Sequence, residues 1–210
     1  MEEQKEKMTL NLLSQVISVV FHPVFLPVYG LLIIFNAPTF MVYLPYDIKR
    51  VIFLLATVNM TVVPLALIPL LRYRNLITSY SMESASERII PLSLGVLLYT
   101  VTTVIFYSYQ IPVLIKSFML AASVTSLILL VITFWWKISI HSAGLGALLA
   151  TVMSLSIRME ARLATLLIVM ILLSGLVMTS RLYLRAHNPS QVYGGFVTGF
   201  AAFIIIMGII

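Results

Sequence analysis

The last part of the chain, residues Leu163–Ile210, reads LATLLIVMILLSGLVMTSRLYLRAHNPSQVYGGFVTGFAAFIIIMGII. It contains two apolar runs, Leu163–Thr179 and Val192–Ile210, and a polar island between them, Ser180–Gln191. A helix of about 20 apolar residues can cross the roughly 30 Å of a bilayer's hydrocarbon core. The stretch therefore predicts two transmembrane helices joined by a short connection. Arginine, histidine and amide groups at a membrane boundary need partners, so the island is a candidate functional site.

The same pattern runs through the rest of the chain. Of the 210 residues, 61% are hydrophobic and 10% are charged, whereas a soluble globular domain carries about 25% charged residues. Further apolar runs that are long enough to span a membrane are Leu12–Phe35, Val51–Leu71, Ile89–Tyr107, Val113–Trp136 and Ile140–Ile157. We predict an all-α fold, a polytopic transmembrane helical bundle of six to seven spans. A short polar N-terminal segment, 1–11, precedes a single transmembrane domain over 12–210.

Composition excludes several classes of function. The chain has no cysteine, which excludes disulfides, thiolate metal sites and a cysteine nucleophile. Three histidines and seven acidic residues leave a metal centre possible but poorly supplied with ligands, and we expect no cofactor. The basic residues flank spans instead of forming a soluble basic stripe, so we expect no nucleic-acid partner. A transporter is less favoured because the spans lack acidic residues. The first apolar run is not followed by a small-residue cleavage site, so we expect it to be retained.

Alternation of the connections across the membrane collects polar segments on one face. Together with the N-terminus, this face receives Arg72–Arg88, Lys137–His141 and Ser180–Gln191. It carries eight lysines and arginines, and the opposite face carries five. The positive-inside rule would place the polar face in the cytoplasm. However, Arg88, Arg181 and Arg185 are candidates for substrate contacts, and without them the count is five against five. The sequence leaves the sidedness open.

Glycines lie near the start of two predicted spans: Gly144, Gly146, Gly194, Gly195 and Gly199. Small residues allow helix backbones to approach closely. We therefore expect the fifth and seventh predicted helices to pack tightly and to bring their site-bearing ends together.

The histidines and arginines of the polar face suit a phosphate ester. Arginine binds non-bridging oxygens in a bidentate way, and imidazole titrates near neutrality. One histidine can attack phosphorus while the other protonates the leaving oxygen. The alternative is that these residues only end helices and contact headgroups, the role we expect for Arg72 and Arg74. We interpret His22, inside the first predicted span, as a buried or interfacial histidine of a kinked helix.

The spacing of these residues resembles a known family. The third signature of the type 2 phosphatidic acid phosphatase superfamily is Ser-Arg-x5-His-x3-Asp. The segment Ser180–Gln191 resembles it: Ser180-Arg181 is followed after five residues by His187 and after three more by position 191. Ile138–His141 occupies the place of the second signature, Pro-Ser-Gly-His, and Arg88–Pro91 loosely matches the Arg-Pro that ends the first. The resemblance covers the chain from Arg88 to its end.

This resemblance implies a helical membrane phosphatase that needs no metal and hydrolyses phosphoric monoesters or pyrophosphates of lipids. Candidate substrates are phosphatidate, phosphatidylglycerophosphate and a polyprenyl (pyro)phosphate. His187 would be the nucleophile that becomes phosphohistidine, and His141 the general acid and then the general base. The substrate-binding group would be Arg88, Ser139, Arg181 and Lys137. The partners would be membrane lipids, and we expect the protein in a bacterial cytoplasmic membrane, with its oligomeric state left open.

Three positions depart from the family pattern. Ser81 stands where the family has a lysine, which Lys137 would have to replace, and Ile140 stands where it has a glycine. Gln191 replaces the acid that fixes the tautomer of the histidine; a comparable Asp→Asn change in a serine protease costs about 10⁴ in kcat. Glu83 and Glu87 are candidate substitutes for that carboxylate. The sequence therefore leaves two readings open, a phosphatase and a catalytically impaired relative that binds a phospholipid or a partner.

Overall fold

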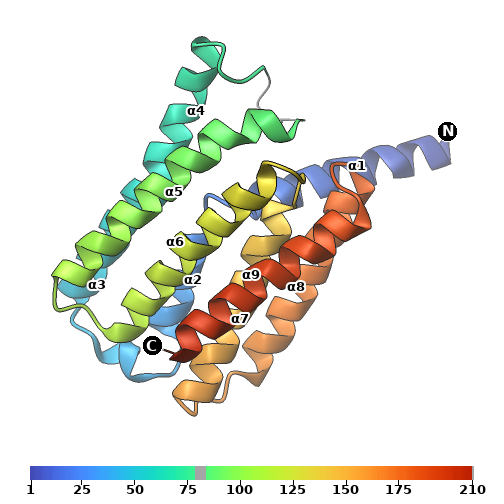
Figure 1. Ribbon diagram of the computed structural model, residues 1–210. Helices are drawn as coiled ribbons and strands as arrows, with labels where there is room; N and C mark the ends of the chain where they lie inside the picture. The colour runs from blue at the N-terminus through green and yellow to red at the C-terminus, as the bar shows by residue number, and fades with distance from the viewer. Residues whose placement is uncertain (79–83, 210) are drawn as a thin grey trace.

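The computed structural model describes residues 1–78 and 84–209. Over these ranges the chain is helical and contains no strand (Figure 1). The elements in chain order are α1 (Glu2–Val20), α2 (Leu26–Asn36), the 3₁₀ turn η1 (Phe40–Tyr43), α3 (Tyr46–Thr57), the π-helical turn η2 (Val58–Val62), α4 (Val63–Tyr73), α5 (Ala85–Ser108), α6 (Val113–Thr133), α7 (Ile140–Arg158), α8 (Ala164–Tyr183) and α9 (Pro189–Ile209).

Within the described ranges, six helical segments are long and apolar enough to cross a membrane. The first is the continuous segment Tyr46–Tyr73, formed by α3, η2 and α4, and the others are α5 to α9. The predicted all-α polytopic bundle is confirmed, and the protein is an integral membrane protein. Among these spans α6 and α7 are the most enclosed by their neighbours.

The prediction of one span over Leu12–Phe35 is wrong. Helix α1 ends at Val20 and α2 begins only at Leu26. Pro23 has no backbone N–H and a fixed φ, so it disfavours continuation of α1, while Pro27 is tolerated in the first turn of α2. Helix α2 has 11 residues, which gives a length of about 16 Å and is too short to cross the hydrocarbon core alone.

Hydrogen bonds from two side-chain hydroxyls hold the break between α1 and α2. The Thr61 hydroxyl donates to the Val24 carbonyl oxygen at 2.7 Å, and the Tyr29 hydroxyl donates to the Val20 carbonyl oxygen at 3.0 Å. These bonds satisfy carbonyl groups that the interrupted helix leaves without an intrahelical donor.

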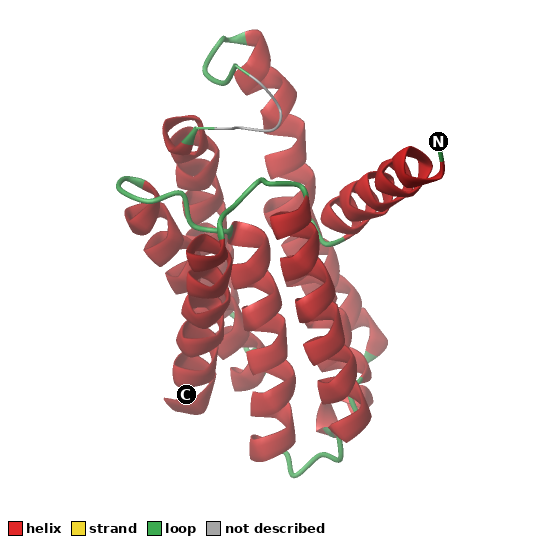
Figure 2. Cartoon of the chain, turned by 90° about the vertical axis from the view of Figure 1, so that its right-hand side faces the viewer, coloured by secondary structure: helices red, strands yellow, loops and turns green. Residues whose placement is uncertain are grey.

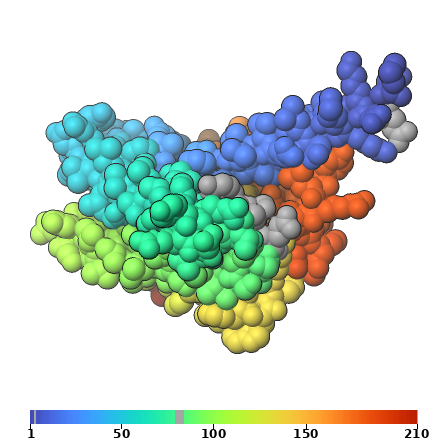
Figure 3. Space-filling view, turned by 90° about the horizontal axis from the view of Figure 1, so that it is seen from above, coloured from blue at the N-terminus to red at the C-terminus, as the bar shows by residue number. Residues whose placement is uncertain are grey.

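The connections alternate between the two ends of the bundle as predicted (Figure 1). Helices α4, α6 and α8 end, and α5, α7 and α9 begin, at one end, which we call the site end. Helix α1 leaves the bundle from this end at a steep angle to the spans (Figure 2). Seen from the site end, α1 extends outward past α8, against which it packs (Figure 3). Its buried side chains are Ser14 and Ser18, at 8% and 7% exposure.

Glycines bring α7 and α9 into backbone contact, which confirms the predicted close packing. A Cβ at Gly195 would overlap the carbonyl oxygen of Ser139, and a Cβ at Gly199 would overlap that of Ala143. The Ser139 backbone N–H also donates to the carbonyl oxygen of Gln191 at 3.1 Å. The starts of the two helices, which carry the second and third candidate motifs, are therefore fixed against each other.

Candidate functional site

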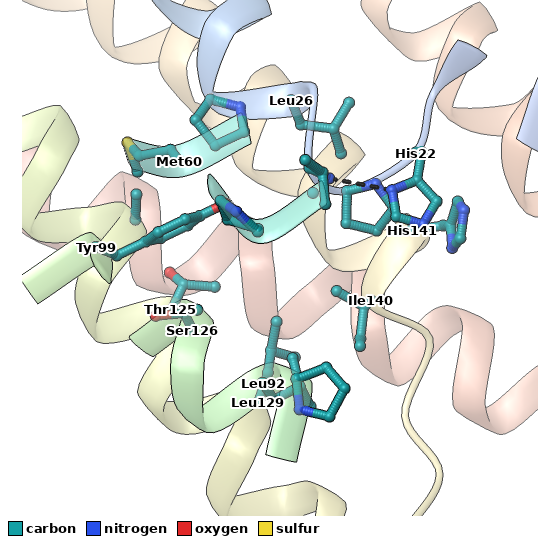
Figure 4. A pocket seen from close by; sticks show the side chains of 18 of the residues that line it. His22, Leu26, Met60, Leu92, Tyr99, Thr125, Ser126, Leu129, Ile140 and His141 are labelled. Atoms are coloured by element: carbon teal, nitrogen blue, oxygen red, sulfur yellow. Dashed lines mark hydrogen bonds between the residues drawn. The ribbon is translucent and has the colours of Figure 1, made fainter. Parts of the chain in front are cut away.

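A cavity of about 280 Å³ lies among α2, α4, α5, α6, α7, α8 and α9 (Figure 4). Most of its wall is apolar, with side chains such as Leu92, Leu129 and Ile140. Arginine and histidine side chains line it toward the site end: His22, Arg88, His141, Arg181 and His187. The structure therefore brings together Arg88, His141, Arg181 and His187 of the predicted site, on the wall of one cavity.

His187 lies in the connection between α8 and α9 and is 7% exposed. Its Nδ1 atom lies 3.2 Å from the carbonyl oxygen of Lys137 and 3.1 Å from Oε1 of Gln191. Both neighbours are hydrogen-bond acceptors, so Nδ1 carries the proton and donates. The lone pair of the neutral ring is then on Nε2, which is the atom that a nucleophilic histidine uses.

The Gln191 amide is held with its oxygen toward His187. Oε1 also accepts a hydrogen bond from the backbone N–H of Asn188 at 3.2 Å. A flipped amide would place its NH₂ group against two donors, the Asn188 N–H and the His187 Nδ1–H. Gln191 stands where the family signature has a carboxylate. It therefore accepts the hydrogen bond of His187, as a carboxylate would, but it contributes no negative charge.

Burial lowers the pKa of His187 from its ordinary value of 6.5 to about 4, with further lowering by the positive charges of Arg88 and Arg181. The hydrogen bond to Gln191 acts in the opposite direction and raises it, and Lys137 lowers it further. Without a bound anion, the His187 ring is therefore neutral near pH 7, as a nucleophile requires.

His141 lies in the first turn of α7 and is oriented by α1. Its Nε2 atom lies 3.2 Å from the carbonyl oxygen of Ser18, so Nε2 carries a proton and donates. Proton exchange with a ligand is then left to Nδ1. In this respect the Ser18 carbonyl orients His141 in the same way that Gln191 and Lys137 orient His187.

Two guanidinium groups supply the positive charge of the cavity. Arg88, at the start of α5, is 9% exposed. Arg181, in the last turn of α8, has a buried Nε atom with no hydrogen-bond partner in the described part of the chain. Arg185 is exposed and does not line the cavity; it lies just after α8 in the left-handed conformation, with φ at 50°. Buried guanidinium donors beside an apolar cavity favour an anionic ligand.

Three predicted residues lie behind the cavity wall instead of on it. Gln191 and Lys137 contact His187 from outside the cavity, Lys137 through its carbonyl oxygen. Ser139 is fully buried, and its hydroxyl accepts hydrogen bonds from the N–H and hydroxyl of Ser142 at 3.4 and 2.9 Å. In the structure Ser139 is thus the N-cap of α7.

Of the candidate replacements for the missing carboxylate, Glu87 lies within the described residues, and its hydrogen bonds go to Thr78 instead of His187. Glu87 accepts hydrogen bonds through Oε1 from the backbone N–H of Thr78, at 3.0 Å, and from its hydroxyl. Ser81 and Glu83, which the sequence comparison also singled out, lie outside the described residues.

His22 was missed as a site residue by the sequence interpretation. It lies in the break between α1 and α2, and its ring meets that of His141 edge to face with centroids 5.4 Å apart (Figure 4). A signal was present, because an ionisable residue within a predicted span is a functional candidate by default.

Farther along the cavity, the wall becomes apolar with isolated hydroxyl groups. Tyr99 and Thr125 line this part (Figure 4), and the Thr125 hydroxyl is buried without a hydrogen-bond partner among the described residues. The cavity thus combines a cationic end with an apolar extension, an arrangement that fits a ligand with an anionic head and a hydrocarbon chain.

No protein-family model, curated protein or solved structure matches the chain. Among the described residues, no group of three or more histidine, cysteine, aspartate or glutamate side chains is arranged to hold a metal ion.

Proposed function

We propose that this integral membrane protein is a phosphatase that hydrolyses a lipid-linked phosphate through a phosphohistidine on His187. The observation that carries the proposal is the pairing of His187 with two guanidiniums on one cavity wall. Nδ1 of His187 is held by two oxygen acceptors, which leaves the Nε2 lone pair for attack. Arg88 and Arg181 stand in the same wall to bind the phosphoryl oxygens.

In the first half-reaction, Nε2 of His187 attacks phosphorus and the bond from phosphorus to the leaving oxygen breaks. His141, which takes up a proton at Nδ1 when the anionic substrate binds, gives this Nδ1 proton to the leaving oxygen and keeps its Nε2–H on the Ser18 carbonyl. The phosphorylated ring of His187 retains its Nδ1–H, which donates to Gln191 and to the Lys137 carbonyl.

In the second half-reaction, water attacks the phosphorus of phosphohistidine and the N–P bond breaks. Nδ1 of the now neutral His141 accepts the proton from that water, which restores the imidazolium. Inorganic phosphate leaves, and His187 recovers its Nε2 lone pair. The two guanidiniums stabilise negative charge on the phosphoryl oxygens throughout.

The shape of the cavity supports a lipid as the substrate. The phosphate would lie at the cationic end and the chain along the apolar wall, which suits phosphatidate, phosphatidylglycerophosphate or a polyprenyl (pyro)phosphate equally. The proposal places the protein in a bacterial cytoplasmic membrane, where such lipids are made and recycled.

A second function, binding of a lipid phosphate without turnover, is favoured by one observation. Gln191 orients His187 but supplies no negative charge to stabilise the positive ring of phosphohistidine. The cationic cavity would still hold a phosphate in that case.

Phosphate release in metal-free buffer from a panel of lipid phosphates tests the proposal. We expect release by the wild-type protein, loss of at least 10³-fold in His187→Ala, as roughly found for removal of a catalytic triad residue, and near wild-type rates in Arg185→Ala. Arg185 is a matched control because it belongs to the same connection but is exposed. A wild-type protein that releases no phosphate from any lipid but binds it would exclude the phosphatase and leave the binding function.

A further inference from the structure

His22 belongs to the candidate site although it comes from the N-terminal part of the chain. The break between α1 and α2 places its side chain on the cavity wall that also carries Arg181 and His141. The His22 and His141 rings are in contact, and the positive charge of Arg181 acts on both. The half-reactions proposed above assign His22 no role.

The backbone next to His22 fixes its tautomer. The N–H of Val24 donates to Nδ1 of His22 at 3.4 Å, so Nδ1 carries the lone pair and Nε2 carries the proton. Burial, and then the charge of Arg181, lower the pKa of His22, which favours the neutral ring. His22 is thus a neutral donor, and no acceptor for its Nε2–H is found in the part of the chain that the structure describes.

A second donor on the same wall also lacks a partner. Nε of Arg181 is buried and makes no hydrogen bond to the described residues. By contrast, His141 has committed its Nε2–H to the Ser18 carbonyl. One end of the cavity therefore carries two N–H groups without acceptors, those of His22 Nε2 and Arg181 Nε. The same end carries Nδ1 of His141, which is left for proton exchange. A buried donor such as the Arg181 Nε–H normally has an acceptor, and a phosphate in the cavity would offer oxygen acceptors both to it and to the Nε2–H of His22, which lines the cavity.

We propose that His22 binds the phosphate of the ligand, with its Nε2–H donating to a phosphoryl oxygen on the side of His141. His22 would then act as a fixed neutral donor rather than as a proton-transfer group, because release of its one ring proton would leave an imidazolate. The break in the first apolar run therefore matters for binding, because it is the turn between α1 and α2 that places His22 on the cavity wall. The inference rests on the proposed phosphate site but not on turnover.

Binding of dodecylphosphonate, a lipid phosphate analogue without a hydrolysable P–O–C bond, tests this assignment. Affinity would be measured by calorimetry on the full chain in maltoside micelles for wild type, His22→Ala, His22→Gln and Tyr29→Phe. In His22→Gln the side-chain NH₂ replaces the imidazole Nε2–H. Tyr29→Phe is the matched control: it removes a hydrogen bond to Val20 in the same break and leaves the cavity wall unchanged.

A hydrogen bond to a charged group has a net value that corresponds to roughly 10- to 150-fold in affinity. We expect His22→Ala to weaken phosphonate binding by a factor in this range, His22→Gln to restore most of the loss, and Tyr29→Phe to bind as wild type. His22→Ala with wild-type affinity would overturn the assignment. So would an equal loss in His22→Ala, His22→Gln and Tyr29→Phe, because it would show that only the structure of the break matters.

The same measurements separate this inference from the proposed hydrolysis. A wild-type protein that binds the phosphonate and depends on His22, yet releases no phosphate from lipid phosphates, refutes hydrolysis and supports the inference. A wild-type protein that releases phosphate but binds the phosphonate independently of His22 supports hydrolysis and refutes the inference. A wild-type protein that neither binds the phosphonate nor releases phosphate overturns both.

Discussion

Replacement of Gln191 by glutamate tests the role of this residue with little change in shape. Oε1 of Gln191 accepts hydrogen bonds from Nδ1 of His187 at 3.1 Å and from the N–H of Asn188 at 3.2 Å. A glutamate side chain has the same length, so one carboxylate oxygen can keep both bonds. The substitution therefore adds a negative charge at the point where the proton of His187 is held.

The size of the effect follows from the change in the hydrogen bond. A neutral hydrogen bond contributes about 1 kcal/mol and one to a charged group about 1.5–3 kcal/mol, a difference of about 1–2 kcal/mol in favour of a positive His187 ring. Since one pKa unit corresponds to about 1.36 kcal/mol, the pKa of His187 should rise from about 4 by roughly one unit. If formation of phosphohistidine limits the rate, kcat should rise by roughly 5- to 30-fold.

The pKa of His187 can be followed by NMR of protein labelled with ¹⁵N-histidine, with resonances assigned from single histidine variants. Phosphate release gives kcat in parallel. Gln191→Met, which removes the acceptor without adding charge, serves as the control and should lower the pKa of His187. A pKa of His187 that is the same in Gln191→Glu and in the wild type would refute the contact between the two side chains as the source of the effect.

Three further outcomes are expected from the geometry. Gly199→Ala should lower the midpoint of thermal unfolding, because the added Cβ would overlap the Ala143 carbonyl oxygen and overpacking costs about 1–3 kcal/mol. Gly208→Ala, the control, should leave the midpoint unchanged, because the space around its Cβ is open. Arg181→Lys should weaken phosphonate binding by roughly tenfold in a titration, because a lysine keeps the charge but loses the planar fork of donors, and an unchanged affinity would remove Arg181 from the site. The free energy of unfolding should fall as the pH is lowered from 6.5 toward about 4, because in this range the unfolded chain binds a proton at His187 that the folded chain excludes. Chemical unfolding of His187→Gln should show a shallower fall, and an identical pH dependence in the two proteins would contradict the lowered pKa.

Run length and hydropathy predicted the spans because backbone groups in lipid must be satisfied within a helix. The same criterion failed over Leu12–Phe35, since hydropathy does not register where a helix is interrupted. Pro23 indicated a kink, but a complete break needs donors for the freed carbonyls. Those donors are the hydroxyls of Thr61 and Tyr29, and Thr61 contacts the break from a position far along the chain.

The sequence predicted which helix ends form the candidate site, but not the direction in which each side chain points. Alternation of the connections placed Arg88, His141, Arg181 and His187 on one face, and the structure places all four on one cavity wall. Motif position alone did not show that the Ser139 hydroxyl points toward Ser142. Capping of a buried helix start competes with ligand binding for such a hydroxyl, and only the packing of α7 against its neighbours decides between them.

The charge on the cavity wall separates the two functions that the site allows. No carboxylate lies among the described residues of this wall, and Arg88 and Arg181 leave it positive. Gln191 preserves this positive field, which favours binding of a phosphate, whereas a carboxylate at position 191 would reduce it but would stabilise the ring of phosphohistidine. Gln191→Glu should therefore weaken binding of dodecylphosphonate while it raises kcat. A variant that gains turnover without losing affinity would mean that the guanidiniums, and not the net charge around His187, set the affinity for phosphate.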